Sequence, residues 1–185
     1  MQFIRHASTP GMRAACFPAA DEDADAASLA RAAALASVVA GSVAWTAPSA
    51  AARQTVAAIG QEARVVPALA EADCGRWRGL SYGQVAREEP DGLASWLSDP
   101  RSAPHGGESL AAHAERVADW LESVRAEPDM VVVCDAGTIR AALGHALELD
   151  PLCAARFDLA PLSFTELTVT KNGWRVAHVN RKVLF

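Results

Sequence analysis

The chain opens with Met1-Gln2-Phe3-Ile4-Arg5-His6-Ala7-Ser8-Thr9-Pro10-Gly11, a short apolar run that ends in an arginine and a histidine. Residues 2–5 predict a β-strand, and the small and turn-forming residues after His6 predict a loop. A guanidinium matches phosphate oxygens in a bidentate manner, and a neutral imidazole can attack phosphorus. Arg5 and His6 at a strand end therefore favour phosphate chemistry, although on their own they also fit a chance basic pair.

The rest of the chain alternates between patterns typical of strands and of helices. We expect strands at 42–46, 64–66 and 130–134, helices at 25–40, 48–59, 108–125 and 137–149, and a helical or irregular insertion at 80–97. The run 130–134 is apolar throughout and too short for a buried helix, which indicates a central parallel strand. Residues 164–170 and 174–179 flank Asn172-Gly173 and predict a C-terminal antiparallel hairpin.

Four polar side chains fall near the ends of the expected strands. Parallel strands joined by helices bind ligands in the crevice at their carboxyl ends. His6 and Asp135 follow the first and the central strand, and Arg53 comes just after the second strand. Glu71 follows a shorter strand and reaches the same crevice from a loop. We therefore expect these side chains to meet in one site.

Composition limits the class of protein. A length of 185 residues with 51% hydrophobic content predicts a single domain over 1–185 and excludes general disorder. A net charge of -5 and a pI near 5.5 argue against a nucleic-acid surface, which usually shows a clustered basic excess. No apolar run approaches the ~20 residues of a membrane span. We expect a small-molecule partner, with no nucleic acid and no membrane.

The cysteines and the start of the chain indicate the compartment. The four cysteines form no Cys-x-x-Cys pair, and the chain begins directly with a strand rather than with a leader segment. We therefore expect reduced thiols and a cytoplasmic location. No grouping of residues suggests a metal site, so we expect neither a metal nor a cofactor. The oligomeric state is left open, with a homodimer among the alternatives.

Five segments give the chain a resemblance to the histidine phosphatase superfamily, which has the phosphoglycerate-mutase-like fold. Residues 5–9 resemble its Arg-His-Gly-x-Thr motif, and residues 49–55 resemble its Ser-x-x-x-Arg-x-x-Thr segment. Residues 69–79 are similar to its Leu-x-Glu-x-x-x-Gly-x-Trp-x-Gly stretch, and residues 106–109 to its Gly-Gly-Glu-Ser turn. Residues 131–140 align with a strand that ends in His-Gly-Gly-x-x-Arg. The resemblance spans nearly the whole chain.

The resemblance implies a three-layer α/β fold, in which helices flank a mostly parallel central sheet that ends in an antiparallel hairpin. It also implies two-step phosphoryl transfer without a metal. His6 would attack the phosphorus of a phosphomonoester, Arg5 and Arg53 would bind the phosphoryl oxygens, and Glu71 would protonate the leaving group. Water would then hydrolyse the phosphohistidine. A hydrolase of the alpha-ribazole-phosphatase-like branch is favoured over a mutase, because the chain is short for a mutase.

The chain departs from the family pattern at two positions. Ala7 replaces the usual glycine of the first motif, and Asp135 stands where the family has its second active-site histidine. An ionised aspartate would repel a phosphoryl group. Three interpretations follow: the site is impaired and binds without catalysis, Asp135 is kept protonated and donates a hydrogen bond, or Asp135 recognises a cationic part of the substrate. The enzyme interpretation is favoured, because the nucleophile, both arginines and the acid are present.

A second enzyme interpretation uses a cysteine. Residues 134–140 spell Cys-x5-Arg after an apolar strand, a pattern of cysteine-dependent phosphatases, in which Cys134 would attack and Arg140 would bind the oxygens. This motif leaves Arg5 and His6 unexplained, so Cys134 is interpreted as a small buried residue. His113 and His145 fall within expected helices, where structural or surface roles are favoured.

Overall fold

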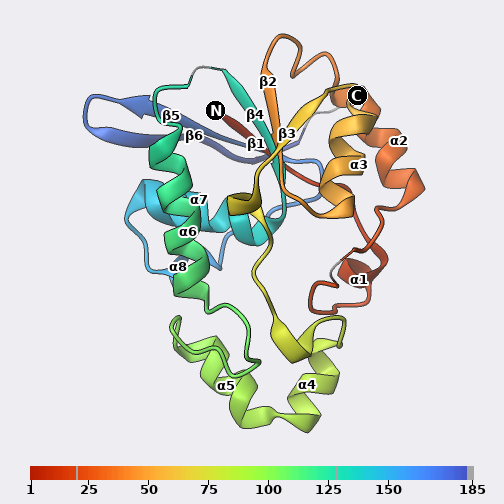
Figure 1. Ribbon diagram of the computed structural model, residues 1–185, viewed down its shortest axis with the longest axis vertical. Helices are drawn as coiled ribbons and strands as arrows, with labels where there is room; N and C mark the ends of the chain where they lie inside the picture. The colour runs from red at the N-terminus through yellow and green to blue at the C-terminus, as the bar shows by residue number, and fades with distance from the viewer. Residues whose placement is uncertain (20, 128, 183–185) are drawn as a thin grey trace.

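The computed structural model describes residues 1–19, 21–127 and 129–182. It contains a six-stranded sheet in the order β3-β2-β4-β1-β5-β6 (Figure 1). The strands are β1 (Gln2–Arg5), β2 (Val43–Thr46), β3 (Ala63–Val65), β4 (Met130–Cys134), β5 (Phe164–Thr170) and β6 (Gly173–Arg181). The first four are parallel to one another, whereas β5 is antiparallel to its neighbours β1 and β6. The predicted sheet and the C-terminal hairpin are confirmed.

Helices cover both faces of this sheet. They are α1 (Pro10–Arg13), α2 (Ala26–Ala32), α3 (Ala50–Ala58), α4 (Tyr82–Glu88), α5 (Pro90–Ser98), α6 (Leu110–Ser123), α7 (Ala136–Leu147) and α8 (Pro151–Ala154). The chain moves across the sheet in one direction from β1 to β3 and returns in the other, so right-handed crossovers place α2 and α3 opposite α6 and α7. Figure 1 shows these two pairs on opposite sides of the strands. The expected three layers are present.

The central strand is the most buried element. Met130 to Cys134 are each at most 3% exposed, and they form the middle of the main hydrophobic core. This confirms the interpretation of the apolar run as a central parallel strand, because such a strand is covered on both faces.

The alanine-rich segment 25–40 differs from its prediction. Helix α2 ends at Ala32, a 3₁₀ turn covers Ala33–Leu35, and irregular turns follow. The segment packs Leu35 and Val39 into the core, at 1% and 0% exposure, while Val38 points outward. Tertiary packing has overridden the helix propensity of alanine.

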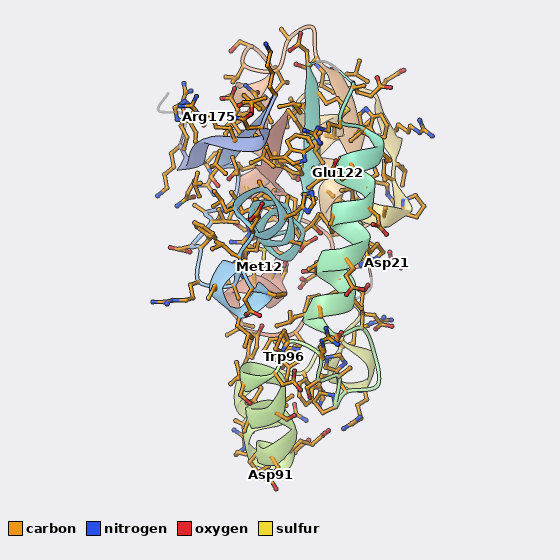
Figure 2. The ribbon with its side chains drawn as sticks, turned by 90° about the vertical axis from the view of Figure 1, so that its left-hand side faces the viewer. Met12, Asp21, Asp91, Trp96, Glu122 and Arg175 are labelled. Atoms are coloured by element: carbon orange, nitrogen blue, oxygen red, sulfur yellow. The ribbon has the colours of Figure 1, made fainter. Side chains whose placement is uncertain are left out.

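The insertion at 80–97 is helical. Helices α4 and α5 form a lobe at one end of the molecule (Figure 1). Phe17, Cys74, Trp77 and Val85 form a second, smaller core beneath it. Figure 2 shows Trp96 near the start of this lobe and Asp91 at its far tip. A small cluster of this kind packs the lobe in place and remains separate from the main hydrophobic core.

Two loops that carry family-like motifs join through glycines. Glu108 N donates to Asp73 O at 2.7 Å, and Arg76 N donates to His105 O at 3.1 Å. A Cβ on Gly107 would lie 2.0 Å from Asp73 O, and one on Gly75, which has φ +48°, would lie 2.2 Å from His105 O. Only glycine permits so close an approach. The contact fixes the end of the loop that carries Glu71.

We predict that Gly107→Ala lowers the free energy of unfolding by about 2–4 kcal/mol, because the new methyl group would force the two backbones apart. The matched control is Gly83→Ala in α4, where the nearest atom is the Arg87 side chain at 3.7 Å. This control should be neutral or slightly stabilising, since alanine favours a helix. Urea unfolding of both variants measures the difference, and equal midpoints would contradict the prediction.

Candidate functional site

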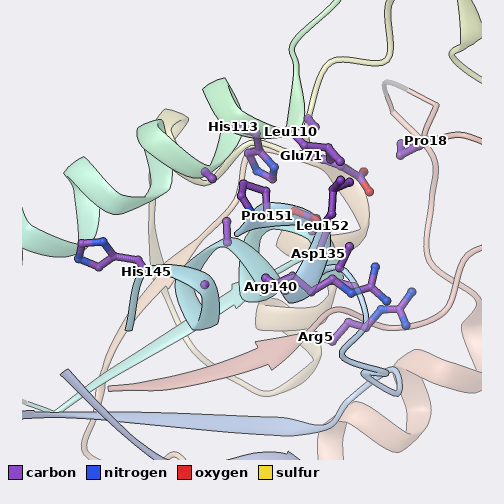
Figure 3. A pocket seen from close by; sticks show the side chains of 18 of the residues that line it. Arg5, Pro18, Glu71, Leu110, His113, Asp135, Arg140, His145, Pro151 and Leu152 are labelled. Atoms are coloured by element: carbon purple, nitrogen blue, oxygen red, sulfur yellow. The ribbon is translucent and has the colours of Figure 1, made fainter. Parts of the chain in front are cut away.

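A cavity of about 1110 Å³ opens at the carboxyl ends of β1 and β4. Its polar lining includes Arg5, His6, Glu71, His113, Asp135 and Arg140. Figure 3 shows Arg5, Asp135 and Arg140 side by side, with Glu71 and His113 across from them. Of the predicted site residues, His6, Glu71, Asp135 and Arg5 therefore do meet at this edge of the sheet.

His6 is held in one orientation by the backbone. Its amide donates to Cys134 O at 2.9 Å, which continues the β1–β4 pairing by one residue, and its ring Nδ1 lies 2.8 Å from Ala7 O. Since a carbonyl only accepts, Nδ1 carries the proton and Nε2 carries the lone pair. Burial lowers the pKa of His6. The imidazole is thus neutral near pH 7, with Nε2 available for nucleophilic attack or for metal or proton binding.

The loop after His6 is anchored to helix α3. Ala7 N donates to Thr55 Oγ1 at 2.9 Å, and Thr55 Oγ1 donates to Ala51 O at 2.6 Å. Ser49 caps the same helix by accepting from Ala52 N. Thr55, at 0% exposure, therefore fixes the face of α3 that meets the loop.

Arg53 does not join the site. It is exposed and is not among the residues that line the cavity. Two positions along a helix are about 200° of rotation, so the burial of Thr55 turns Arg53 away from the loop. The sequence held a signal of this: one residue separates Arg53 from Thr55, whereas the family pattern has two. The expectation that Arg53 lies in the site is therefore corrected: its side chain lies outside the cavity.

Arg5 and Arg140 lie beside each other at the cavity (Figure 3). Arg5 donates through one terminal nitrogen to Leu159 O, and Arg140 Nε donates to Phe157 O at 2.9 Å. Burial, and then the charge of Arg140, lower the pKa of Arg5. Sequence reasoning considered Arg140 only within the cysteine motif and so missed this pair. The alignment of residues 131–140, which ends at that arginine, was the available signal.

Glu71 comes from the loop after the 3₁₀ turn Pro67–Leu69. Burial, and then the charge of Asp135, raise the pKa of Glu71 well above its ordinary value, against the opposing effect of Arg5. A carboxyl group in this state keeps its proton at a pH where an exposed one has lost it. It is therefore able to act as a proton donor.

Asp135 is the N-cap of helix α7. Its Oδ1 accepts from Thr138 N at 3.0 Å and its Oδ2 from Thr138 Oγ1 at 2.6 Å, and the residue is 3% exposed. Both oxygens are thus engaged by the first turn of the helix, where a negative charge is favourable. This capping role is an addition to the sequence analysis, which treated Asp135 only as a substituted histidine.

His113 also lies closer to the site than the sequence indicated. It is 3% exposed on α6, lines the cavity, and places Nε2 3.4 Å from Thr138 Oγ1. Burial lowers its pKa. A surface role is excluded. The helical pattern gave no signal for its placement, because that depends on how α6 packs against α7.

The cysteine alternative is wrong. Cys134 is 0% exposed in the main core and is absent from the cavity lining. Burial raises the pKa of its thiol well above the ordinary value, so no thiolate is available. Strand alternation turns it away from the side that Asp135 faces.

The cavity extends from these polar groups to an aromatic wall. Phe17, Tyr82 and Trp96 line it, and the ring centroid of Phe17 lies 4.2 Å from that of Tyr82 and 5.7 Å from that of Trp96.

Within the described ranges, no group of three or more His, Cys, Asp or Glu is arranged to hold a metal ion. The helices in those ranges are also too short or too polar to span a membrane.

Comparison with known proteins gives one family match and several partial matches. A family model described as histidine phosphatase superfamily (branch 1) matches residues 1–182. Glucosyl-3-phosphoglycerate phosphatase of Mycobacterium tuberculosis (strain ATCC 25618 / H37Rv) is 42% identical over 94 residues, which cover 45% of this chain and 42% of that protein. Phosphoserine phosphatase 1 of Hydrogenobacter thermophilus is 36% identical over 58 residues, 31% of this chain and 28% of that protein. These matches span less than half the length of those relatives.

A solved structure extends the likeness to the whole chain. The mycobacterial glucosyl-3-phosphoglycerate phosphatase in complex with VO3 superposes with a TM-score of 0.85 at 25% identity, covering 98% of each chain. A vanadium oxyanion is a stand-in for a phosphoryl group, so that relative was solved with a phosphate mimic bound.

We predict that Glu71→Gln stabilises the protein increasingly as pH rises. The unfolded Glu71 ionises near its ordinary pKa, whereas the folded one holds its proton to higher pH, so the parent loses stability between those two values. Glutamine has no such loss. The melting temperature of Glu71→Gln minus that of the parent should grow by a few degrees from pH 4.5 to pH 8. For the exposed control Glu62→Gln, the difference in melting temperature from the parent should not change with pH. A difference that does not change with pH for Glu71→Gln would contradict the raised pKa of Glu71.

Proposed function

The chain belongs to the histidine phosphatase superfamily, and from that premise we propose that it hydrolyses a small phosphorylated metabolite through a phosphohistidine intermediate. The observation that carries this proposal is His6, a buried neutral imidazole whose Nδ1 is held by Ala7 O. Its Nε2 lone pair shares the cavity with the Arg5 guanidinium and the protonated Glu71.

The first step forms one bond and breaks one. His6 Nε2 attacks phosphorus, the bond from phosphorus to the ester oxygen breaks, and the Glu71 proton passes to that oxygen, which leaves as an alcohol. Arg5 stabilises the negative charge on the phosphoryl oxygens. The hydrogen bond from Nδ1 to Ala7 O stabilises the positive charge that the ring acquires.

The second step regenerates the site. Water attacks phosphorus, the bond from phosphorus to Nε2 breaks, and ionised Glu71 takes a proton from the water. Inorganic phosphate leaves, and His6 and Glu71 return to their starting states. No step requires a metal ion.

The substrate class follows from the relatives and from the cavity. The relatives are named for glucosyl-3-phosphoglycerate and for phosphoserine, both small phosphorylated metabolites. The cavity has room for more than a phosphate, since it continues to the wall of Phe17, Tyr82 and Trp96. We propose that this wall contacts the leaving group.

One observation supports a second candidate function, a phosphate-ligand-binding protein with impaired catalysis. The Asp135 carboxylate lines the cavity, where it opposes a phosphoryl dianion. Two hydrogen bonds from Thr138 and the dipole at the N-terminus of α7 reduce this repulsion but do not remove it. We favour hydrolysis, because His6, Arg5 and Glu71 are all in place.

We predict that His6→Ala lowers phosphate release from phosphomonoesters on the order of a thousandfold or more, because the attacking nitrogen is lost. Cys134→Ala should remain close to the parent. Quenching the parent during turnover should trap a phosphoryl label that is labile to acid and stable to base, as phosphohistidine is. Retained turnover in His6→Ala would refute the mechanism.

We predict that Asp135→Asn binds orthophosphate about tenfold more tightly than the parent at pH 7, because a carboxylate that repels the anion becomes neutral. Its amide oxygen can still accept from Thr138 N, so the cap is largely kept. Asp135→His should bind more tightly still and hydrolyse esters faster. A silent parent revived by histidine would identify the binding-only function, whereas an active parent that histidine abolishes would give Asp135 a dedicated role.

A further inference from the structure

Two of the arginines that line the cavity, Arg5 and Arg140, are anchored by the same segment. The chain between α8 and β5 presents Phe157 O to Arg140 Nε at 2.9 Å and Leu159 O to a terminal nitrogen of Arg5. Each guanidinium is thus fixed at one edge by a backbone carbonyl. The other terminal N–H groups of both side chains have no hydrogen-bond partner among the described residues, and both guanidinium groups line the cavity (Figure 3).

Two guanidinium groups side by side repel each other. The charge of Arg140 acts directly on Arg5, whose pKa burial and Arg140 together lower. Within the part of the chain that the structure describes, neither arginine has a carboxylate within 4.0 Å. Arg5 Nε is in addition buried without a hydrogen-bond partner among those residues. A pair that is held together against repulsion, with N–H groups to spare, fits an anion.

The carboxyl groups near the pair offset its repulsion only in part, since Asp135, Glu71 and Asp158 act on Arg5 against burial and the charge of Arg140. Burial raises the pKa of Glu71, which disfavours its charged form, and both oxygens of Asp135 accept hydrogen bonds from Thr138. The pKa of Arg5 is still lowered overall, so a phosphoryl dianion bound beside the two guanidinium groups would stabilise their positive charges.

The topology places the pair at the nucleophile. Arg5 pairs with Cys134 across the parallel strands β1 and β4, so the residues that follow, His6 and Asp135, leave the sheet side by side. Arg140 lies on the second turn of α7, the helix that Asp135 begins. Arg5 and Arg140 thus approach the space beyond His6 from a strand and from a helix.

We propose that Arg140 is the second phosphoryl-binding arginine of this site and, with Arg5, performs the role that the sequence assigned to Arg53. The inference deepens the proposed function, because it assigns the residue that holds the phosphoryl group on His6. It also explains how a site that contains Asp135 can still attract a phosphate.

Direct binding of orthophosphate and orthovanadate, measured by calorimetry at pH 7, tests this assignment without requiring turnover. Arg140→Gln should lose about 10- to 100-fold in affinity, the range expected for hydrogen bonds to a charged group. Arg140→Lys keeps the positive charge but lacks the planar pair of guanidinium donors, so its affinity for phosphate should fall at least about fivefold. The exposed control Arg31→Gln should stay within twofold. Melting curves without ligand show that each variant is folded.

Three results would overturn the assignment: phosphate binding by folded Arg140→Gln equal to the parent, a loss confined to Arg53→Gln, or no phosphate binding by the parent at millimolar concentration. If Arg140→Gln does not fold, parent-like affinity in Arg140→Lys overturns it. Failure of the proposed function appears differently. A parent that binds phosphate through Arg140 but releases none from any ester keeps the assignment and refutes hydrolysis, whereas unchanged kcat and KM in Arg140→Gln refute the assignment alone.

Discussion

The parallel pairing of β1 with β4 is the constraint on which the site depends. The register sets Arg5 against Cys134, and the bond from His6 N to Cys134 O carries the pairing one residue beyond the strand. This fixes His6 at the point where α7 begins, capped by Asp135. An imidazole, a carboxylate and a helix N-terminus therefore meet at one sheet edge, as expected at the carboxyl ends of parallel strands.

Burial shifts the pKa of several groups that line the cavity. Burial lowers the pKa of His6 and raises the pKa of Glu71, which favours the neutral forms that the proposed nucleophile and proton donor need. Burial and the charge of Arg140 lower the pKa of Arg5, and the nearby carboxyl groups offset this only in part. Asp135 is stabilised beside Arg5 by charge and by two hydrogen bonds from Thr138 in the first turn of α7. Burial and the charge of Arg140 thus oppose the charged state of Arg5, a cost in stability that functional sites commonly carry.

Local patterns were enough to predict what local physics decides. The apolar run of β4, the Asn172-Gly173 turn and the strand that delivers His6 follow from periodicity and turn chemistry. Arg53 could not be placed that way, because its direction depends on which face of α3 the buried Thr55 presents to the loop at Ala7. Arg140 depends on a carbonyl 17 positions away, at Phe157. Such contacts arise only when distant elements pack, and no window of sequence contains them.

The central claim is that an anion binds at His6 between Arg5 and Arg140. A crystal structure of the protein with orthovanadate tests it most directly. We expect vanadium bonded to His6 Nε2, with Arg5 and Arg140 donating to its equatorial oxygens and Glu71 next to the apical oxygen opposite His6. Vanadate bound away from His6, or bound there with Arg140 turned to solvent and Arg53 in contact, would contradict it.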